Sequence, residues 1–213
     1  MRLLLTASFI LLILAGCSRV QKEYYPDGEL KSEITMSSGK RNGVARYYYE
    51  SGSVQIECFY RNDTLDSTFT RYYTGEIREI SQDYHKGMLH GKSRYWNPTG
   101  QLVIESHYQN GKLHGPYVEY YPNRHVKSEG TYTDGMVDGR WLYYSEAGNI
   151  IGTGHFSQGS GEQRSFYEDG RLHRITSYTN NVKDGPEVTF SPEGTVSEKI
   201  YYRQGELYKD TLP

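Results

Sequence analysis

The chain of 213 residues carries 24 Lys and Arg against 26 Asp and Glu, a formal charge of −2, and it contains 22 tyrosines but only two cysteines. This small negative charge attracts no polyanion, so we exclude nucleic acid as a partner. Aliphatic residues are few, but tyrosine rings supply large apolar surfaces that a thin structure can bury, which favours an ordered chain over a disordered one.

The first 16 residues have the pattern of an export signal. A basic residue precedes an apolar stretch at 3–15, which is too short to span a bilayer comfortably. The stretch ends in Leu-Ala-Gly-Cys at 14–17, which resembles the bacterial lipobox, where the cysteine thiol receives a diacylglycerol. The resemblance implies a lipoprotein signal peptide at 1–16, lipid attachment at Cys17 and a short lipidated tether over 17–23. An ordinary secretory signal is the alternative. Acylation would leave no disulfide framework.

One column of aromatic residues then repeats along the chain in steps of 24 residues, with a single step of 22. We call it the aromatic column, and its members are Tyr60, Tyr84, Tyr108, Tyr132, Phe156, Tyr178 and Tyr202. A fixed period in this range indicates stacked supersecondary units. Turn dipeptides such as Asn110-Gly111 follow the column, because glycine adopts positive φ at little cost. Each unit is therefore predicted to be a hairpin that leads into the next.

We predict an all-β fold for residues 24–213, an elongated single-layer antiparallel sheet of about eight consecutive hairpin repeats. No window of useful length has an amphipathic helical pattern, and nothing indicates a second domain. The unit around residues 158–161 has lost about two residues, so we expect a kink or a bulge there.

The units resemble MORN repeats, in the variant found in bacterial proteins described as antitoxin-like. The resemblance rests on an aromatic pair followed by glycine and leucine, and then on Tyr-x-Asn-Gly-Lys-x-x-Gly, best seen at 84–91, 108–115 and 132–139. It implies the extended hairpin sheet, together with scaffolding, protein contact or membrane association. It implies no shared catalytic residues.

Other polar residues carry little indication of chemistry. His90 and His114 occupy the same repeat position, but two strands separate them by about 9 to 10 Å, too far to share one zinc ion. We therefore predict no metal site, and no motif indicates a cofactor. Cys58 is predicted to be a packed side chain. A partial acidic column is predicted to be a solvated face; it contains Glu33, Glu57, Glu105 and Glu129.

These observations predict a non-enzymatic scaffold or interaction module anchored to the bacterial cell envelope as a lipoprotein. Ser18 after Cys17 favours the outer membrane. The expected partners are the membrane, through the lipid anchor, and a protein or an envelope polymer. The aromatic column either stacks only to stabilise the thin sheet or also forms the binding face. The alternatives are an antitoxin-like or immunity protein that neutralises a toxin outside the cytoplasm, and an envelope hydrolase.

Overall fold

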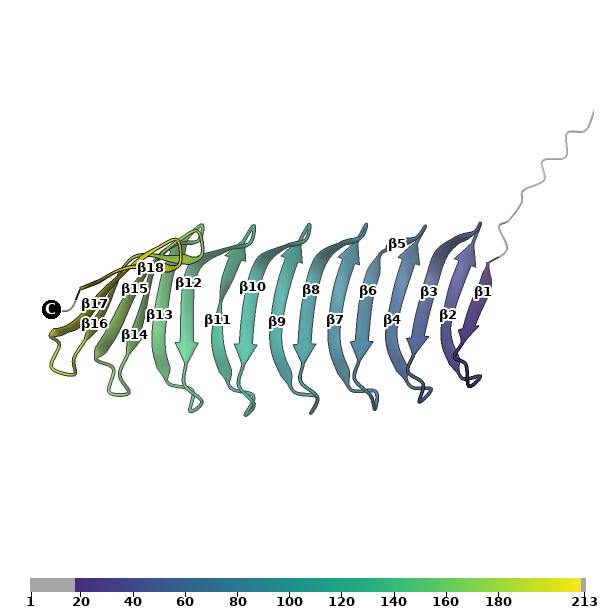
Figure 1. Ribbon diagram of the computed structural model, residues 1–213, viewed down its shortest axis with the longest axis horizontal. Coiled ribbons are helices and arrows are strands. Elements are labelled where there is room, and N and C mark those ends of the chain that lie inside the picture. The colour runs from purple at the N-terminus through teal and green to yellow at the C-terminus, as the bar shows by residue number, and fades with distance from the viewer. Residues whose placement is uncertain (1–17, 212–213) are drawn as a thin grey trace, which may run out of the picture.

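The computed structural model describes residues 18–211, which form 18 strands in one open sheet (Figure 1). The first nine are β1 (Arg19–Tyr24), β2 (Leu30–Ser37), β3 (Lys40–Tyr48), β4 (Val54–Arg61), β5 (Thr64–Leu65), β6 (Ser67–Tyr72), β7 (Arg78–His85), β8 (Met88–Trp96) and β9 (Leu102–Gln109). The others are β10 (Lys112–Tyr120), β11 (Val126–Thr133), β12 (Met136–Tyr144), β13 (Ile150–Ser157), β14 (Ser160–Phe166), β15 (Leu172–Thr179), β16 (Val182–Phe190), β17 (Val196–Arg203) and β18 (Glu206–Thr211). The predicted signal peptide and Cys17 lie outside the described residues.

Apart from β5 and β6, each strand pairs antiparallel with its neighbour in the chain, so the predicted single-layer antiparallel sheet is confirmed. β5 and β6 both pair with β4 and together replace one strand, which is interrupted at Asp66. The sheet also starts earlier than predicted. Residues 19–24 form β1 and pair with β2, so most of the predicted tether over 17–23 belongs to the sheet.

Two-residue turns join the strands along one side of the sheet, where the strands end, and we call this row of turns the tight edge. Asn110 and Gly111 have φ of 51° and 82°, as a type I′ turn requires. The Gly111 amide also donates to the Leu89 carbonyl of the preceding unit at 2.8 Å. Equivalent backbone bonds link each turn to the one before it, with donors Asp63, Gly87, Gly111, Gly135, Gly159, Asn181 and Gly205. The tight edge is therefore a continuous hydrogen-bonded ladder.

Longer turns form the other edge, and tyrosine hydroxyls link them. Within one such turn the Gly28 amide donates to the Tyr25 carbonyl at 3.0 Å, and the Tyr25 hydroxyl donates to the Tyr48 carbonyl of the next unit at 2.7 Å. Five hydroxyls make this bond, those of Tyr25, Tyr49, Tyr73, Tyr121 and Tyr167. Each bond joins two units in addition to the strand pairing and the ladder of the tight edge.

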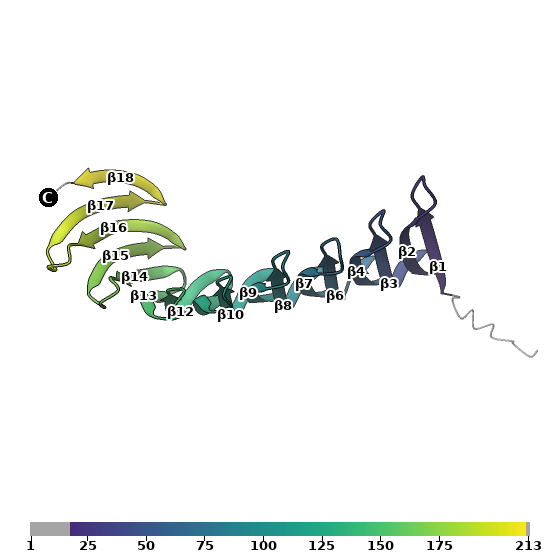
Figure 2. The same ribbon diagram turned by 90° about the horizontal axis from the view of Figure 1, so that it is seen from below.

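The sheet changes direction towards its C-terminal end. Strands β1 to β10 face the viewer in Figure 1, whereas β14 to β18 are seen face-on only after the rotation in Figure 2. The change accompanies the shortened unit. In the β13–β14 hairpin Phe156 pairs with Gly161 and the register is regular, whereas other tight-edge hairpins such as β9–β10 contain a register shift. The irregularity predicted for residues 158–161 is thus a hairpin without a bulge.

Side chains alternate between two faces, and one of them carries the aromatic column; we call this the column face. The buried side chains are concentrated on the column face. Because the single layer has no second sheet to cover this face, its side chains are buried by their neighbours on the same face. Among the described residues the buried apolar side chains are Ala45, Cys58, Trp141 and Phe156. Cys58 is packed, as predicted, and burial raises the pKa of its thiol.

Candidate functional site

The aromatic column lies in one row of the column face, on alternate strands from β4 to β17. In the regular units the ring pairs on one side with an apolar residue of its own hairpin, as Tyr108 does with Leu113. On its other side it pairs with a glycine of the preceding strand, as Tyr108 does with Gly91. A Cβ at Gly91 would come within 3.0 Å of the Asp83 side chain on β7. Sequence spacing therefore located the column correctly.

Only one contact between column members is direct, the edge-to-face packing of Phe156 on Tyr178 with ring centroids 5.8 Å apart. It occurs at the shortened unit, where Gly161 pairs with both rings. The hairpin residue that separates the rings elsewhere, such as Leu113, is absent here. Phe156 is buried and the other members are half-buried.

A tryptophan that the repeat pattern did not predict completes the packing. The Trp141 ring contacts Tyr132, Tyr117 and Tyr143, with centroids 5.2, 5.7 and 6.4 Å away, and is 4% exposed. It lies against Gly130, where a Cβ would come within 2.2 Å of the ring. The sequence signal was this glycine, in a position where most other units carry a side chain.

Burial determines the chemistry of these rings. It raises the pKa of Tyr117 and of Tyr143 to about 12, and it raises the pKa of Tyr132 and Tyr178 as well. The hydroxyls therefore stay protonated at neutral pH. The column face can stack, pack and donate hydrogen bonds, but these tyrosines offer no anionic nucleophile or base.

The acidic column lies on the opposite face, and its carboxylates are half-buried and paired. Arg46 contacts Glu57 at 2.6 Å and Glu33 at 3.3 Å, and Arg94 contacts Glu105 at 2.6 Å. Glu129 instead accepts a hydrogen bond from the Tyr144 hydroxyl at 2.6 Å. These carboxylates stay partly exposed to solvent, but the sequence periodicity did not reveal the basic residues on adjacent strands that pair with them.

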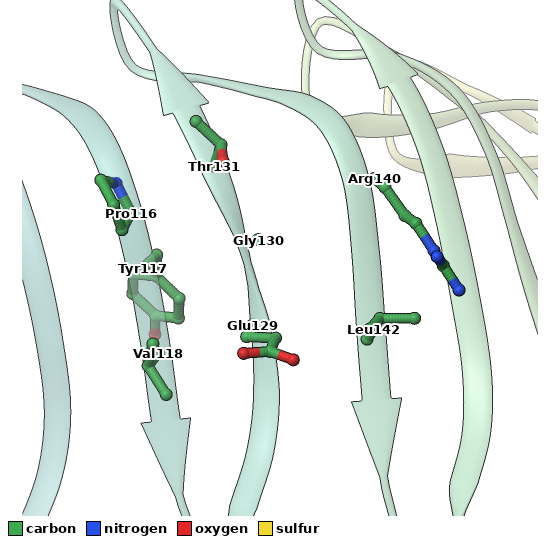
Figure 3. Close-up of a pocket in the computed structure, with 8 residues that line it drawn as sticks. All are labelled: Pro116, Tyr117, Val118, Glu129, Gly130, Thr131, Arg140 and Leu142. Carbon is green, nitrogen blue, oxygen red and sulfur yellow. The ribbon is translucent and has the colours of Figure 1, made fainter.

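A shallow hollow of about 250 Å³ lies over β10, β11 and β12 (Figure 3). Its lining residues are Pro116, Tyr117, Val118, Glu129, Gly130, Thr131, Arg140 and Leu142. Gly130 lies at its centre, with the Trp141 ring against the other side of this glycine. The hollow brings one carboxylate and one guanidinium to its rim but no nucleophile with a general base, so its groups fit contact with a partner better than catalysis.

His90 and His114 lie on β8 and β10, on different hairpins. His90 packs its ring near His85, with centroids 5.9 Å apart, and His114 lies 3.5 Å from Asp134. Within residues 18–211 there is no group of three or more side chains that could hold a metal ion.

Comparison with known families gives five matches to one family, described as the MORN repeat variant. Five segments of this chain are similar to MORN repeats. They span residues 20–37, 41–62, 89–110, 113–134 and 160–180. The segments between them include the interrupted strand β5–β6 and the strand that carries Trp141. No curated protein matched the chain.

MORN repeats suggest an interaction scaffold, and the family is generally a non-catalytic repeat module. The described part of the chain includes no helix long and apolar enough to cross a membrane.

Proposed function

We propose that this protein is a non-enzymatic scaffold of the bacterial cell envelope, which binds a protein or an envelope polymer through the column face. The observation that carries the proposal is the open single-layer sheet from β1 to β18, whose column face presents a row of half-buried rings to solvent. Repeat sheets of this kind offer extended surfaces, and half-buried tyrosines can stack on a partner without first unfolding.

The partner is tested by capture from membrane extracts with the full chain as bait. Several envelope components recovered together would support a scaffold. A single stoichiometric toxin-like partner would overturn it in favour of the antitoxin-like or immunity function. Turnover of an envelope polymer by the purified chain would contradict the non-enzymatic proposal.

Two variants on opposite faces of neighbouring strands test the binding surface. Tyr108→Ala removes a column ring from β9, and Lys92→Ala removes a charged side chain from the other face of the paired strand β8. We expect Tyr108→Ala to weaken partner binding by more than about tenfold, whereas Lys92→Ala leaves it unchanged. A loss of binding that follows the loss of thermal stability in step would show that the column is structural only.

We further propose that Cys17 carries a lipid that anchors the protein, in the outer membrane if the host sorts by Ser18. Support comes from the lipobox-like residues 14–17 and from β1, which begins two residues after the cysteine. The anchor would then hold the first edge of the sheet close to the lipid surface. Replacing Cys17 by Ala should release the protein from membranes and change its electrophoretic mobility. A variant that stays membrane-bound with unchanged mobility would refute the anchor.

A further inference from the structure

A second hollow, of about 220 Å³, lies on the column face over β14, β15 and β16. Its lining differs in character from the rest of that face. It contains Gln163, Ser165, Arg174, Thr176, Tyr178, Lys183 and Glu187. Three of these seven are charged, although the column face elsewhere holds mostly aromatic, aliphatic and small residues.

Strand register shows which residues the charged ones replace. Arg174 stands four residues before its column member, where β4, β7 and β9 carry Ile56, Ile80 and Ile104. Lys183 pairs with Tyr178 where Leu89 pairs with Tyr84 and Leu113 with Tyr108.

The third replacement is Glu187, which stands two residues after the glycine that pairs with a column ring. Ala45 and Trp141 occupy this position on β3 and β12. The carboxylate is 5% exposed. Of the three charged side chains only Glu187 is buried, whereas 40% of Arg174 and 33% of Lys183 are exposed. Charged groups in place of apolar side chains are usually unfavourable for stability, so we look for a ligand that explains their convergence on one hollow.

The contacts within the hollow leave one cation unmatched. Glu187 accepts hydrogen bonds from Lys183 at 2.6 Å and from Thr176 at 2.9 Å. Burial raises the pKa of Glu187, but these two bonds and the nearby cations outweigh it, so the pKa is lowered and the carboxylate is ionised at neutral pH. Two cations and one anion leave a net charge of +1.

The unmatched cation is Arg174. Its nearest carboxylate contact is 3.9 Å from Nη1 to Glu187, and its Nε is buried without a hydrogen-bond partner. A guanidinium fork presents paired donors that match the two oxygens of a carboxylate. Gln163 adds an amide donor, because its oxygen already accepts from the Tyr178 hydroxyl at 3.2 Å.

We propose that this hollow binds the carboxylate of a small acid, with Arg174 as the main contact and Gln163 as a second donor. A monoanion matches the net charge of +1, whereas a phosphate dianion would bring excess negative charge close to buried Glu187. Lys183 holds Glu187 in place and is a positioning residue. The site stands on these contacts alone and does not depend on the scaffold function proposed above.

The test is calorimetric or NMR titration of the full chain with glucuronate, the α-amide of N-acetylglutamate and inorganic phosphate at constant ionic strength. Both organic probes are monoanions, because the α-amide leaves only the side-chain carboxylate. We expect both carboxylates to bind at the signals of β14–β16, and phosphate to bind more weakly. Stronger binding of glucuronate would indicate an acidic sugar as the source, and stronger binding of the amide an acidic peptide side chain. Tighter binding of phosphate, or no carboxylate binding, would overturn the proposal.

The decisive variant is Arg174→Ile, which introduces the residue that β4, β7 and β9 carry at this position. It keeps Glu187 paired with Lys183, so we expect the protein to fold with an unchanged or raised melting temperature while carboxylate affinity falls at least about tenfold. Arg174→Lys keeps the charge without the fork and should weaken binding less. Arg140→Gln removes one charge from the opposite face and is the matched control. Equal affinity in the Arg174→Ile and Arg140→Gln proteins would refute the site.

Discussion

Strands β1 to β9 and strands β10 to β18 form two regions of the one sheet. They share one repeat but differ in the contacts that stabilise them. In the first region the buried apolar side chains are small, Ala45 and Cys58, and three successive tyrosine hydroxyls link the long turns. In the second, the Tyr121 and Tyr167 hydroxyls make the same link, and the buried apolar side chains are the large rings of Trp141 and Phe156. The recurring bond thus runs through both regions, and the second adds ring contacts that occur once.

Asn181 makes a further contact that occurs once. Its side chain accepts from the Val137 amide at 2.9 Å and donates to the Gly135 carbonyl at 2.8 Å, while its own amide donates to Gly159. One residue therefore joins three successive tight turns at the shortened unit. The loss of two residues is compensated by a bridge that regular spacing does not need.

The largest expected effect sharpens this contrast through the two tryptophans. Trp141→Ala removes the centre of the ring cluster and should lower the free energy of unfolding by about 3 to 5 kcal/mol, as for other buried large-to-small changes. Trp96→Ala, in half-buried Trp96 of the first region, is the control and should cost less than half as much. Equal losses in denaturant unfolding would show that both regions depend on ring burial alike.

The next prediction concerns the glycine of the shortened unit. A Cβ at Gly161 would come within 2.0 Å of the His155 carbonyl oxygen, and its φ is +153°. Backbone must move, so Gly161→Ala should lower the free energy of unfolding by about 3 kcal/mol. Gly135→Ala, where φ is +88° and the added carbon meets nothing within 4 Å, should cost about 1 to 2 kcal/mol. Thermal unfolding of the two variants measures the difference, which vanishes if crowding at Gly161 is irrelevant.

A smaller effect is expected from the hydroxyl links of the first region. Tyr49→Phe removes the 2.8 Å bond to the Tyr72 carbonyl and should cost about 1 kcal/mol, with faster hydrogen exchange in the neighbouring turns. Tyr24→Phe changes a tyrosine that is 60% exposed and serves as the control, with an expected change near zero. Equal hydrogen-exchange rates of the turn amides in the Tyr49→Phe and Tyr24→Phe proteins would argue against a stabilising role for the link.

The smallest expected effect is a pH dependence of the stability that Glu33 contributes in the first region. The hydrogen bond from Tyr48 lowers the pKa of Glu33 below its ordinary value of 4.5, and this outweighs the opposing effect of burial. The unfolded chain therefore binds the proton more readily, and stability from Glu33 is present above pH 4.5 and is lost as the pH falls below it. Glu33→Gln should flatten the acid limb of the melting temperature against pH. A limb as steep as that of the parent chain would contradict this assignment.

The periodic part of the structure was predictable from the sequence, because strands, tight turns and the column all depend on spacing. The aperiodic part was not. Trp141 departs from the repeat pattern, and its partner Gly130 is informative only once register is known. The charged group around Glu187 was likewise invisible, since Arg174 and Lys183 lie on different strands that only the register brings together. Ion pairs such as Arg46 with Glu57 were missed for the same reason.

The ladder of backbone bonds along the tight edge has a mechanical consequence. A force pulling the two ends of the sheet apart acts along the hydrogen bonds between strands, so every strand pair in the series carries the same load and the weakest pair opens first. Such a sheet should open hairpin by hairpin at low force and extend in steps, each releasing about one repeat of chain. If one end is fixed to a surface and the other to a partner, the protein would act as an extensible link that yields before its attachments do.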